Sequence, residues 1–459
     1  MYSPRWALLL AGLLLLLLLP SSLSWDLNEP LNGVHFQRVK AHTLPTPDRP
    51  SPRFSRLRNL RAHGPHSQKH HGRHHHHHHG RGGGGHTTAV SHLARRLGRF
   101  DGTKWQNVTG VGDYSTQYAI QCAWDGLGVW LLFDTGSADT WASQSGFRCE
   151  DPAGAPHTQE ACGFGAPLVQ GFAHGQIDDV HFYLQYGSGE QVSGPMGFSD
   201  IACGGLSVFE QQVGLANSTY WHGNNVTVGI LGLAYPSITS AYYGAVGDEA
   251  PWNAVTYPSF FTTAITQGSI DPVFSVSIVR NSSEGILVWG GLPETGWQNR
   301  PNASTDLIIA NLIDQSETAW KYSFYTIIVD ALKWDQTTVT AKHPYIVDTG
   351  TTMMYVPPPL AESVADAFQP RAVYLYQWGA YFAPCDAIPP RLAVVISGVE
   401  FWINPSDLIY RNLVDPLTGY CAVAVASGGS GPYILGDVFL QNVVAVFDVG
   451  AAQMRFYAK

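Results

Sequence analysis

Charged side chains and long apolar runs are both scarce in this chain of 459 residues. Asp, Glu, Lys and Arg make up 13% of it, whereas 45% is hydrophobic and Gly occurs 48 times. Short runs of Thr, Val, Tyr and Trp between turn residues predict mostly β structure, with enough apolar content for about two or three domain cores. After residue 24 no run is apolar enough to cross a bilayer, so we expect no membrane contact.

Motifs for two other classes of hydrolase are missing as well. The chain has no Gly-x-Ser-x-Gly elbow, which argues against a Ser-His-Asp hydrolase. Most of the 19 His precede residue 100, and the later ones are not grouped at metal-ligand spacing, so we expect no metal and no cofactor. The later ones are His157, His174, His181, His222 and His343.

The first 24 residues have the layout of a secretory signal peptide. Arg5 precedes the apolar run 8–19, and Pro20 and small polar residues follow. An exported chain suits the even count of six cysteines, which predicts disulfides, and the presence of N-glycosylation sequons. We therefore expect a secreted, extracellular protein. The sequons stand at Asn107, Asn217, Asn225, Asn281 and Asn302.

Residues 25–99 predict a propeptide that does not fold alone. They are rich in Pro, Arg and His, and the His run 74–79 leads into a Gly-rich stretch. The His tract is interpreted as a spacer, a pH-dependent charge patch, or an incidental metal-binding or engineered segment. The dibasic pair Arg95-Arg96 predicts processing, with the mature chain beginning between Leu97 and Lys104.

The net charge of −9 is the sum of opposite charges on two parts of the chain, a leader (residues 25–100) and a body (residues 101–459). Residues 25–100 carry 13 Lys and Arg against 3 Asp and Glu, which gives +10, and residues 101–459 carry 12 against 32, which gives −20. Arg5 supplies the remaining +1. An acidic body is a poor partner for nucleic acid, and the basic leader screens it while the two are joined.

An apolar run that ends in Asp-Thr-Gly and a hydroxyl residue occurs twice, at 131–137 and 346–352. Its aspartates, Asp134 and Asp348, are 214 residues apart (348 minus 134). An Ile-Leu-Gly follows each copy, at 230–232 and 434–436. Two homologous lobes about an approximate two-fold axis explain this order, and such an axis would bring the two aspartates face to face.

Two facing carboxyls have a definite chemistry. They share one proton in acid, so one member can take a proton from water while the other polarises a carbonyl. The flanking glycines leave room for backbone N–H groups, the threonines can hydrogen-bond across the seam, and the next hydroxyls can reach the outer carboxylate oxygens. These supporting residues are Thr135, Gly136, Ser137, Thr349, Gly350 and Thr351. Two ordinary Asp-Gly turns, or the carboxylate pair of a glycosidase, are the alternatives.

Five motifs in order resemble the pepsin-like family of aspartic endopeptidases, with the secreted fungal members most similar in look. They are Phe-Asp-Thr-Gly-Ser-Ala-Asp-Thr-Trp at 133–141, Tyr-Gly-Ser-Gly at 186–189, Gly-Ile-Leu-Gly-Leu-Ala-Tyr-Pro at 229–236, Val-Asp-Thr-Gly-Thr-Thr at 347–352 and Ile-Leu-Gly-Asp-Val-Phe at 434–439. The resemblance implies a mostly β, bilobal fold about a pseudo-two-fold axis, with the active-site cleft between an N-terminal lobe, 100–297, and a C-terminal lobe, 298–459.

The resemblance also implies roles for single residues. Asp134 and Asp348 would be the catalytic dyad, and Tyr186 would lie on a flap with Trp141 as its hydrogen-bond partner. Ser188 stands where several fungal relatives carry an acid, which argues against a strong preference for basic substrates. The other flap and pocket residues would be Gly187, Leu132, Ile230 and Ile346.

The same resemblance implies two disulfides, Cys149–Cys162 and Cys385–Cys421, and leaves Cys122 and Cys203 for a third. The expected protein is a secreted acid endopeptidase made as a zymogen. It would be a monomer that cleaves protein and peptide substrates without a cofactor and is held by its own propeptide in cis. A catalytically inactive pepsin-fold binding or inhibitor protein is the alternative, although this chain keeps both aspartates and the flap tyrosine.

Overall fold

The computed structural model describes residues 104–112, 116–280, 282–293, 297, 299–309, 322–340 and 342–459. The expected signal peptide and propeptide, the pair Arg95-Arg96 and the sequon residue Asn281 lie outside these residues, so the predictions made for them stay predictions.

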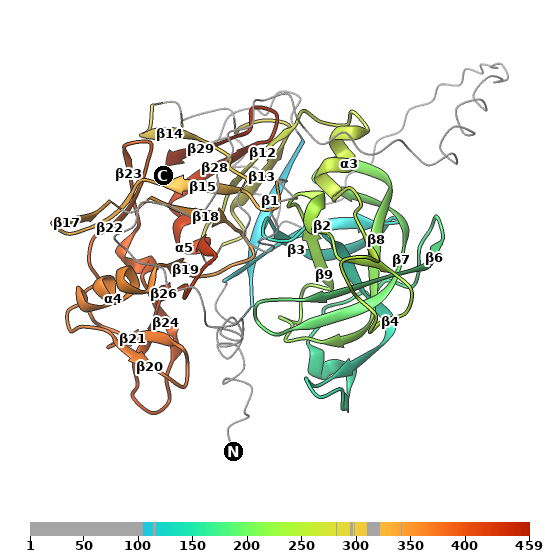
Figure 1. Cartoon of the computed structure of the whole chain (residues 1–459), viewed down its shortest axis with the longest axis horizontal. Helices are drawn as coiled ribbons and strands as arrows, with labels where there is room; N and C mark the ends of the chain where they lie inside the picture. The colour runs from blue at the N-terminus through green and yellow to red at the C-terminus, as the bar shows by residue number, and fades with distance from the viewer. Residues whose placement is uncertain are drawn as a thin grey trace, which may run out of the picture.

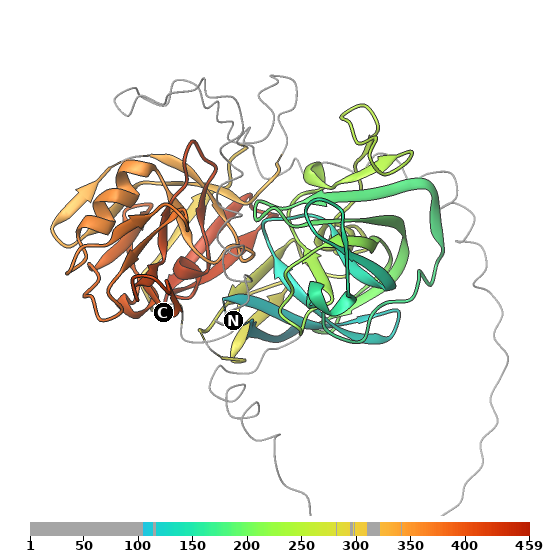
Figure 2. The ribbon, with the colours of Figure 1, turned by 90° about the horizontal axis from the view of Figure 1, so that it is seen from below.

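Two β-rich lobes lie side by side in Figure 1, one coloured blue to green and the other orange to red. The same division is plain in Figure 2, after a quarter turn. The predicted fold class, mostly β and bilobal, is thus confirmed. Among the described residues, no helix combines the length and the apolarity that crossing a membrane requires.

One 16-stranded sheet runs through the first lobe and into the second. Along its main path the order is β11-β10-β6-β7-β8-β4-β9-β3-β2-β1-β13-β12-β28-β29-β14, with β5 on β4. Its strands are β1 (Lys104–Val111), β2 (Gln117–Trp124), β3 (Leu127–Asp134), β4 (Thr140–Glu150), β5 (Pro156–His157), β6 (Gln176–Gln185), β7 (Gln191–Cys203), β8 (Leu206–Tyr220), β9 (Gly229–Gly232), β10 (Ala241–Tyr243), β11 (Ala254–Val255), β12 (Val273–Ser277), β13 (Gly285–Trp289), β14 (Asn302–Asp306), β28 (Val443–Asp448) and β29 (Gln453–Ala458).

Three smaller sheets build the rest of the second lobe. The first has the order β15 (Thr326–Val329), β18 (His343–Val347), β27 (Tyr433–Leu435), β19 (Met354–Val356), β26 (Val425–Ser427). The second is β17 (Thr337–Val339), β16 (Ala331–Trp334), β22 (Leu392–Ile396), β23 (Val399–Trp402), and the third is β20 (Val373–Leu375), β21 (Ala380–Ala383), β25 (Cys421–Val423), β24 (Ile409–Val414).

The helices among the described residues are short. They are the α-helices α3 (Phe260–Thr266), α4 (Pro358–Asp366) and α5 (Asp437–Leu440), and the 3₁₀ turns η4 (Gln159–Cys162), η5 (Pro236–Ile238) and η6 (Pro405–Asp407). Ser259 is the N-cap residue of α3. Phe368 is buried just after α4, which ends at Asp366.

The repeat in the sequence is a repeat in topology. In the first lobe β9 lies between β3, to which it is parallel, and β4, to which it is antiparallel. In the second lobe β27 lies in the same way between β18 and β19. Each Ile-Leu-Gly is therefore the central strand beside one Asp-Thr-Gly strand, which explains why the two motifs recur in the same order.

Strand pairing and aromatic packing join the two halves of the chain. Strand β12 pairs with β28, and the rings of Phe274 and Phe447 stack across this pairing with centroids 4.5 Å apart. Phe133, which precedes Asp134, meets Phe274 edge-on at 6.3 Å. All three rings are buried, so the strand that ends at Asp134 rests on the core that holds the lobes together.

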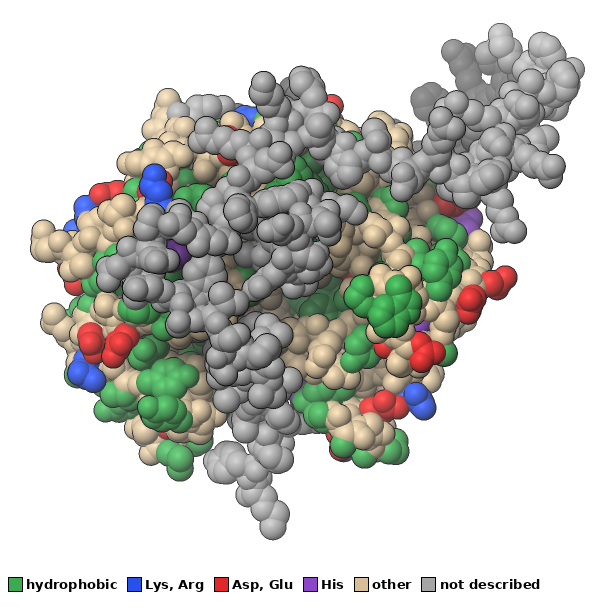
Figure 3. Space-filling view, viewed as in Figure 1, with side chains coloured by type: hydrophobic (Ala, Val, Ile, Leu, Met, Phe, Trp, Pro, Cys, Tyr) green, Lys and Arg blue, Asp and Glu red, His purple; other side chains and the backbone are tan. Residues whose placement is uncertain are grey.

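All six cysteines are paired, as Cys122–Cys203, Cys149–Cys162 and Cys385–Cys421, which are the pairs expected from the sequence. The first bridge joins residues that face each other on β2 and β7. Charged side chains are few on the face drawn in Figure 3, and those in view lie mostly toward its periphery.

Candidate active site

Asp134 and Asp348 occupy equivalent places at the ends of two strands. Asp134 is the last residue of β3, and Asp348 directly follows β18. Each is only 7% exposed. The structure thus brings together, at the junction of the two halves, the two residues that the sequence predicts as a dyad.

The two carboxyl groups have matching hydrogen bonds. The backbone N–H of Gly136 donates to Oδ1 of Asp134 at 2.7 Å, and Gly350 N–H donates to Oδ1 of Asp348 at 2.7 Å. The hydroxyls of Ser137 and Thr351 donate to the respective Oδ2 atoms, each at 2.5 Å. Each carboxyl is therefore oriented by its own loop, and the symmetry of the sequence extends to single atoms.

Two threonines tie the loops to each other across the seam. The N–H of Thr135 donates to Oγ1 of Thr349 at 3.1 Å, and the N–H of Thr349 donates to Oγ1 of Thr135 at 3.0 Å. Each hydroxyl then donates onward to the opposite strand, from Thr135 to the carbonyl of Val347 and from Thr349 to that of Phe133. All four bonds are buried, where water cannot compete for them.

Glycine is required at positions 136 and 350 because the carboxyl group of the other lobe lies very close to each. A Cβ on Gly136 would lie 2.5 Å from Cγ of Asp348, and a Cβ on Gly350 would collide with Oδ1 of Asp134 in the same way. The sequence predicts that these glycines make room for backbone N–H groups. The structure adds that each also leaves space for the carboxyl of the other lobe.

Burial raises the pKa of both carboxyls. For Asp348, burial and the negative charge of Asp134 raise the pKa, and the hydrogen bonds from Thr351 and Gly350 oppose the rise. For Asp134, burial raises the pKa against the hydrogen bonds from Ser137 and Gly136. Because two buried like charges are unfavourable, the pair holds one proton well above the usual range of a carboxyl.

A third carboxyl, Asp437, is buried behind the pair. It begins α5, is fully buried, and neither of its oxygens has a hydrogen-bond partner among the described residues. Burial, with the charges of Asp348 and Asp134 as further causes, raises its pKa well above the usual value. Asp437 therefore stays neutral at acid pH. The sequence offered Ile-Leu-Gly-Asp as a motif but no reason to expect burial.

The residues predicted to form the flap lie on the turn between β6 and β7. Trp141 Nε1 donates to the hydroxyl of Tyr186 at 2.7 Å, the partnership that the sequence led us to expect. Trp221 meets the rings of both residues edge-on, at 5.2 and 5.5 Å.

The other residues predicted for the flap and pocket lie in different surroundings. Ile230 is buried in the same apolar cluster as Trp141 and Trp221, and Leu132 packs against that cluster. Gly187 and Ser188 are exposed at the tip, and Ile346 is buried between its neighbours on β15 and β27.

Glu190, on the turn predicted to be the flap, is a residue that sequence reasoning missed. Its Oε2 accepts from the hydroxyl of Ser188 at 2.8 Å, and its Oε1 accepts from the backbone N–H of His222 at 2.7 Å. Its backbone carbonyl accepts from Tyr186 N–H, which closes the turn. Burial raises the pKa of Glu190 to about 6. The Glu190 carboxyl thus holds the β6–β7 turn against the segment after β8, and no local sequence pattern indicates this contact.

Asp139 lies within the motif at 133–141, and the sequence alone indicates no role for it. It is 1% exposed and accepts from the N–H of Ser240 at 3.0 Å and from the hydroxyl of Tyr257. Burial raises its pKa to about 6. Asp139 thereby holds two later loops against the strand that follows the first Asp-Thr-Gly. Within the described ranges, no group of three or more His, Cys, Asp or Glu could hold a metal ion.

Two buried carboxyls that face each other between similar β lobes are the arrangement of an aspartic peptidase. Residues 127–459 match the family model described as eukaryotic aspartyl protease. The chain is 36% identical over 340 residues to a probable aspartic-type endopeptidase of Aspergillus fumigatus. This alignment covers 72% of this chain and 75% of that protein. The chain belongs to the eukaryotic aspartyl protease family, and it is an aspartic-type endopeptidase.

Two further relatives agree with this assignment. Gastricsin of Mus musculus is 28% identical over 334 residues, with 70% of this chain and 74% of that protein covered. The crystal structure of an aspartic proteinase from Irpex lacteus has a TM-score of 0.57 and 18% identity, and it covers 77% of this chain and 97% of that chain. The latter likeness shows a shared fold. The resemblance found in the sequence is confirmed.

We expect the Thr135 hydroxyl to matter more than its methyl group. Thr135→Val should lower the free energy of unfolding by about 2–4 kcal/mol, because it leaves the Thr349 N–H and the Val347 carbonyl buried without partners. Thr135→Ser keeps the hydroxyl and should lose only about 1 kcal/mol. Urea unfolding at acid pH measures both. Equal losses for the two variants would show that packing, rather than the crossing hydrogen bonds, holds the seam.

Glu190 should make the fold less stable as the pH rises. Its folded pKa, about 6, lies above the ordinary 4.5, so its stabilising contribution is complete below pH 4.5 and is lost as pH rises through 6. Glu190→Gln should therefore reduce the loss of unfolding free energy between pH 4 and pH 7.5 by about 1–2 kcal/mol. Glu362→Gln, on the exposed face of α4, is the matched control for one lost charge. An unchanged loss in Glu190→Gln would refute the assignment.

Proposed function

We propose that this protein is a secreted, acid-active endopeptidase in which Asp134 and Asp348 together activate water. The observation that carries the proposal is the facing pair of buried carboxyls, each oriented by one glycine N–H and one hydroxyl. A shared proton gives the site one base and one acid at the same pH, which direct attack of water on a peptide carbonyl requires.

The proposed reaction has two steps. The ionised carboxylate takes a proton from water as the water oxygen bonds to the carbonyl carbon, and the protonated carboxyl gives its proton to the carbonyl oxygen. The tetrahedral intermediate then collapses: the C–N bond breaks, the leaving nitrogen takes a proton from one aspartic acid, and a hydroxyl of the intermediate returns one to the other carboxylate. The dyad ends as it began, with one proton, and no covalent intermediate is needed.

The flap supplies substrate contacts in this proposal. The Tyr186 ring is held by Trp141 and Trp221, so its position over the substrate is set before binding. Leu132 and Ile230 lie in the same apolar cluster, which favours substrates with large apolar side chains next to the cleaved bond. The natural substrate would be a protein or a peptide.

The N-terminal segments suggest how the protein is exported and how its activity is controlled. The signal-peptide layout of residues 1–24, the three disulfides and the sequons support export and glycosylation. Residues 25–99 would act in cis as an inhibitory propeptide of a monomeric zymogen. At neutral pH the +10 leader and the −20 body attract each other, and protonation of body carboxylates in acid weakens that attraction.

Both members of the dyad should be equally necessary. Asp134→Asn and Asp348→Asn should each lower kcat for a denatured protein substrate in acid by at least about 10³-fold, because either change removes the shared proton and with it the base or the acid. The measurement is peptide release at acid pH with the processed enzyme, produced for the variants by cleavage of the leader in trans.

Asp366→Asn, an exposed position on α4, is the control and should leave the rate unchanged. Activity that survives either dyad substitution, or that resists a statine-type inhibitor, would overturn the mechanism. A wild-type protein that is folded but has no activity against any protein substrate would instead support the inactive binding protein.

The precursor should process itself in acid. Full-length precursor with the signal peptide removed should stay intact near neutral pH and convert within a single acid incubation to a chain beginning between residues 97 and 104. N-terminal sequencing gives the new start. The Asp134→Asn precursor, carried through in parallel, should remain uncut. A wild-type precursor that stays intact in acid, while added active enzyme cuts it, would show that processing occurs only in trans.

A further inference from the structure

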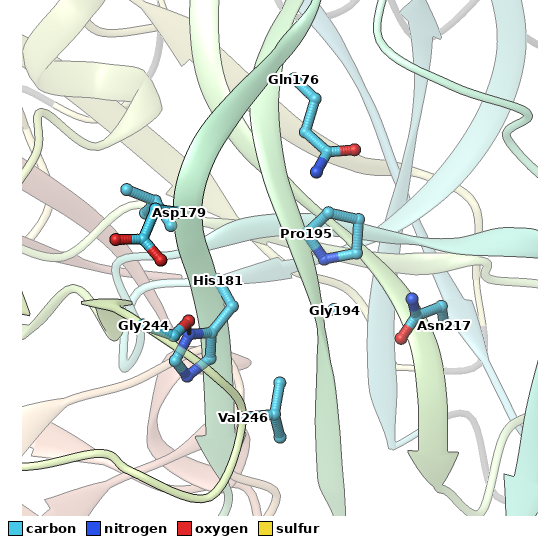
Figure 4. A pocket seen from close by; sticks show the side chains of 9 residues that line it. Gln176, Asp179, His181, Gly194, Pro195, Asn217, Gly244 and Val246 are labelled. Atoms are coloured by element: carbon cyan, nitrogen blue, oxygen red, sulfur yellow. Dashed lines mark hydrogen bonds between the residues drawn. The ribbon is translucent and has the colours of Figure 1, made fainter.

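A groove of about 270 Å³ lies on the first lobe, formed by residues outside the two Asp-Thr-Gly loops and the flap tip. Figure 4 shows Gln176, His181, Val246 and Asn217 around Pro195 and Gly194. One water needs only about 10–15 Å³ of such space, and the groove is many times larger. The groove is therefore large enough for a small ring-shaped ligand.

Two irregularities in the sheet make the groove. The pairing of β6 with β7 shifts register between Gln176 and His181, and the pairing of β7 with β8 shifts between Ser193 and Met196. The strands bend at such shifts, and Gly194 lies within the second one. A Cβ at Gly194 would collide with the carbonyl of Leu215, so the floor has no side chain there. The hollow is thus part of the backbone rather than a gap left by one side chain.

One wall is a loop held in place by His181. The Nδ1 atom of His181 lies 2.8 Å from the carbonyl of Gly244, and its Nε2 lies 3.0 Å from Oε1 of Glu249. His181 is 5% exposed. These two contacts fix the loop after β10, which carries Val246, over the base of β6. Val246 is 53% exposed and presents an apolar surface to the groove.

Asn217 lines the groove and begins a glycosylation sequon, Asn217-Ser218-Thr219. It is exposed, and its side-chain amide makes no hydrogen bond within the described part of the chain. Two other sequon residues differ in this respect: Nδ2 of Asn107 donates to Ser283 and Nδ2 of Asn302 donates to Arg300. Asn217 is therefore a sequon residue with an accessible side-chain amide at the rim of the groove.

We propose that Asn217 carries an N-linked glycan and that the groove binds the first N-acetylglucosamine of that glycan. The inference rests on the proposed export of the chain. An N-acetylglucosamine has hydroxyls and an acetamide at its edges and an apolar face of C–H groups. Gln176 and Asp179 are exposed on the groove wall, without side-chain partners among the described residues, and Val246 offers the apolar contact. The sugar would join β6, β8 and the loop after β10.

The test compares two glycans within one molecule. The full chain is secreted from a glycosylating eukaryotic host and treated, under native conditions, with an endoglycosidase that cuts between the first two N-acetylglucosamines. Glycopeptide mass spectrometry follows cleavage at Asn217 and, as the internal control, at Asn302, which does not line the groove. We expect cleavage at Asn217 to be about tenfold slower, the protection that one or two net hydrogen bonds give. After denaturation the two rates should be equal.

A groove variant separates the bound sugar from simple crowding. Gln176→Ala with Val246→Ala removes two exposed side chains, so the fold should be retained, and the two rates should come within about threefold of each other. Equal native rates in the wild-type protein, or an unmodified Asn217 beside a modified Asn302, would overturn the inference alone. If neither residue carries a glycan while a control glycoprotein from the same host does, the proposed export route fails as well.

Discussion

The crossing hydrogen bonds of Thr135 and Thr349 set the geometry on which the proposed site depends. Each loop uses one N–H and one hydroxyl to hold the other half, so neither half can shift without breaking four buried hydrogen bonds. This rigid seam presses Gly136 against one carboxyl and Gly350 against the other. The burial of both aspartates, and the rise in their pKa, follow from that close approach.

The same burial links the chemistry of the site to the pH at which the fold is most stable. Besides the dyad, Asp139, Glu190 and Asp437 have a raised pKa because they are buried. A carboxyl with a raised folded pKa stabilises the fold at acid pH and loses that contribution as the pH rises. Acid therefore favours both the singly protonated dyad and the folded state around it. One physical cause, removal of carboxyls from water, explains both.

The sequence predicted that Asp134 and Asp348 lie close together because the symmetry of the fold appears in the sequence as a repeated motif. A strand motif that occurs twice in the same order implies two lobes and an axis, and the topology of β3-β9-β4 and β18-β27-β19 agrees. Glu190 and Asp139 could not be found in that way. Glu190 acts through the backbone of His222, 32 residues away, and Asp139 through Tyr257, 118 residues away, and no periodicity records such contacts.

The β6–β7 hairpin connects the proposed active site with the groove. Its turn carries Tyr186 and is fastened by Glu190, whereas its base carries His181 and lines the hollow beside Asn217. A flap must open to admit substrate, so its free energy of opening depends on how firmly the base is held. The contacts of His181 with Gly244 and Glu249 hold the base from one side. A sugar in the groove would hold it from the other, and motion would then be confined to the turn that bears Tyr186.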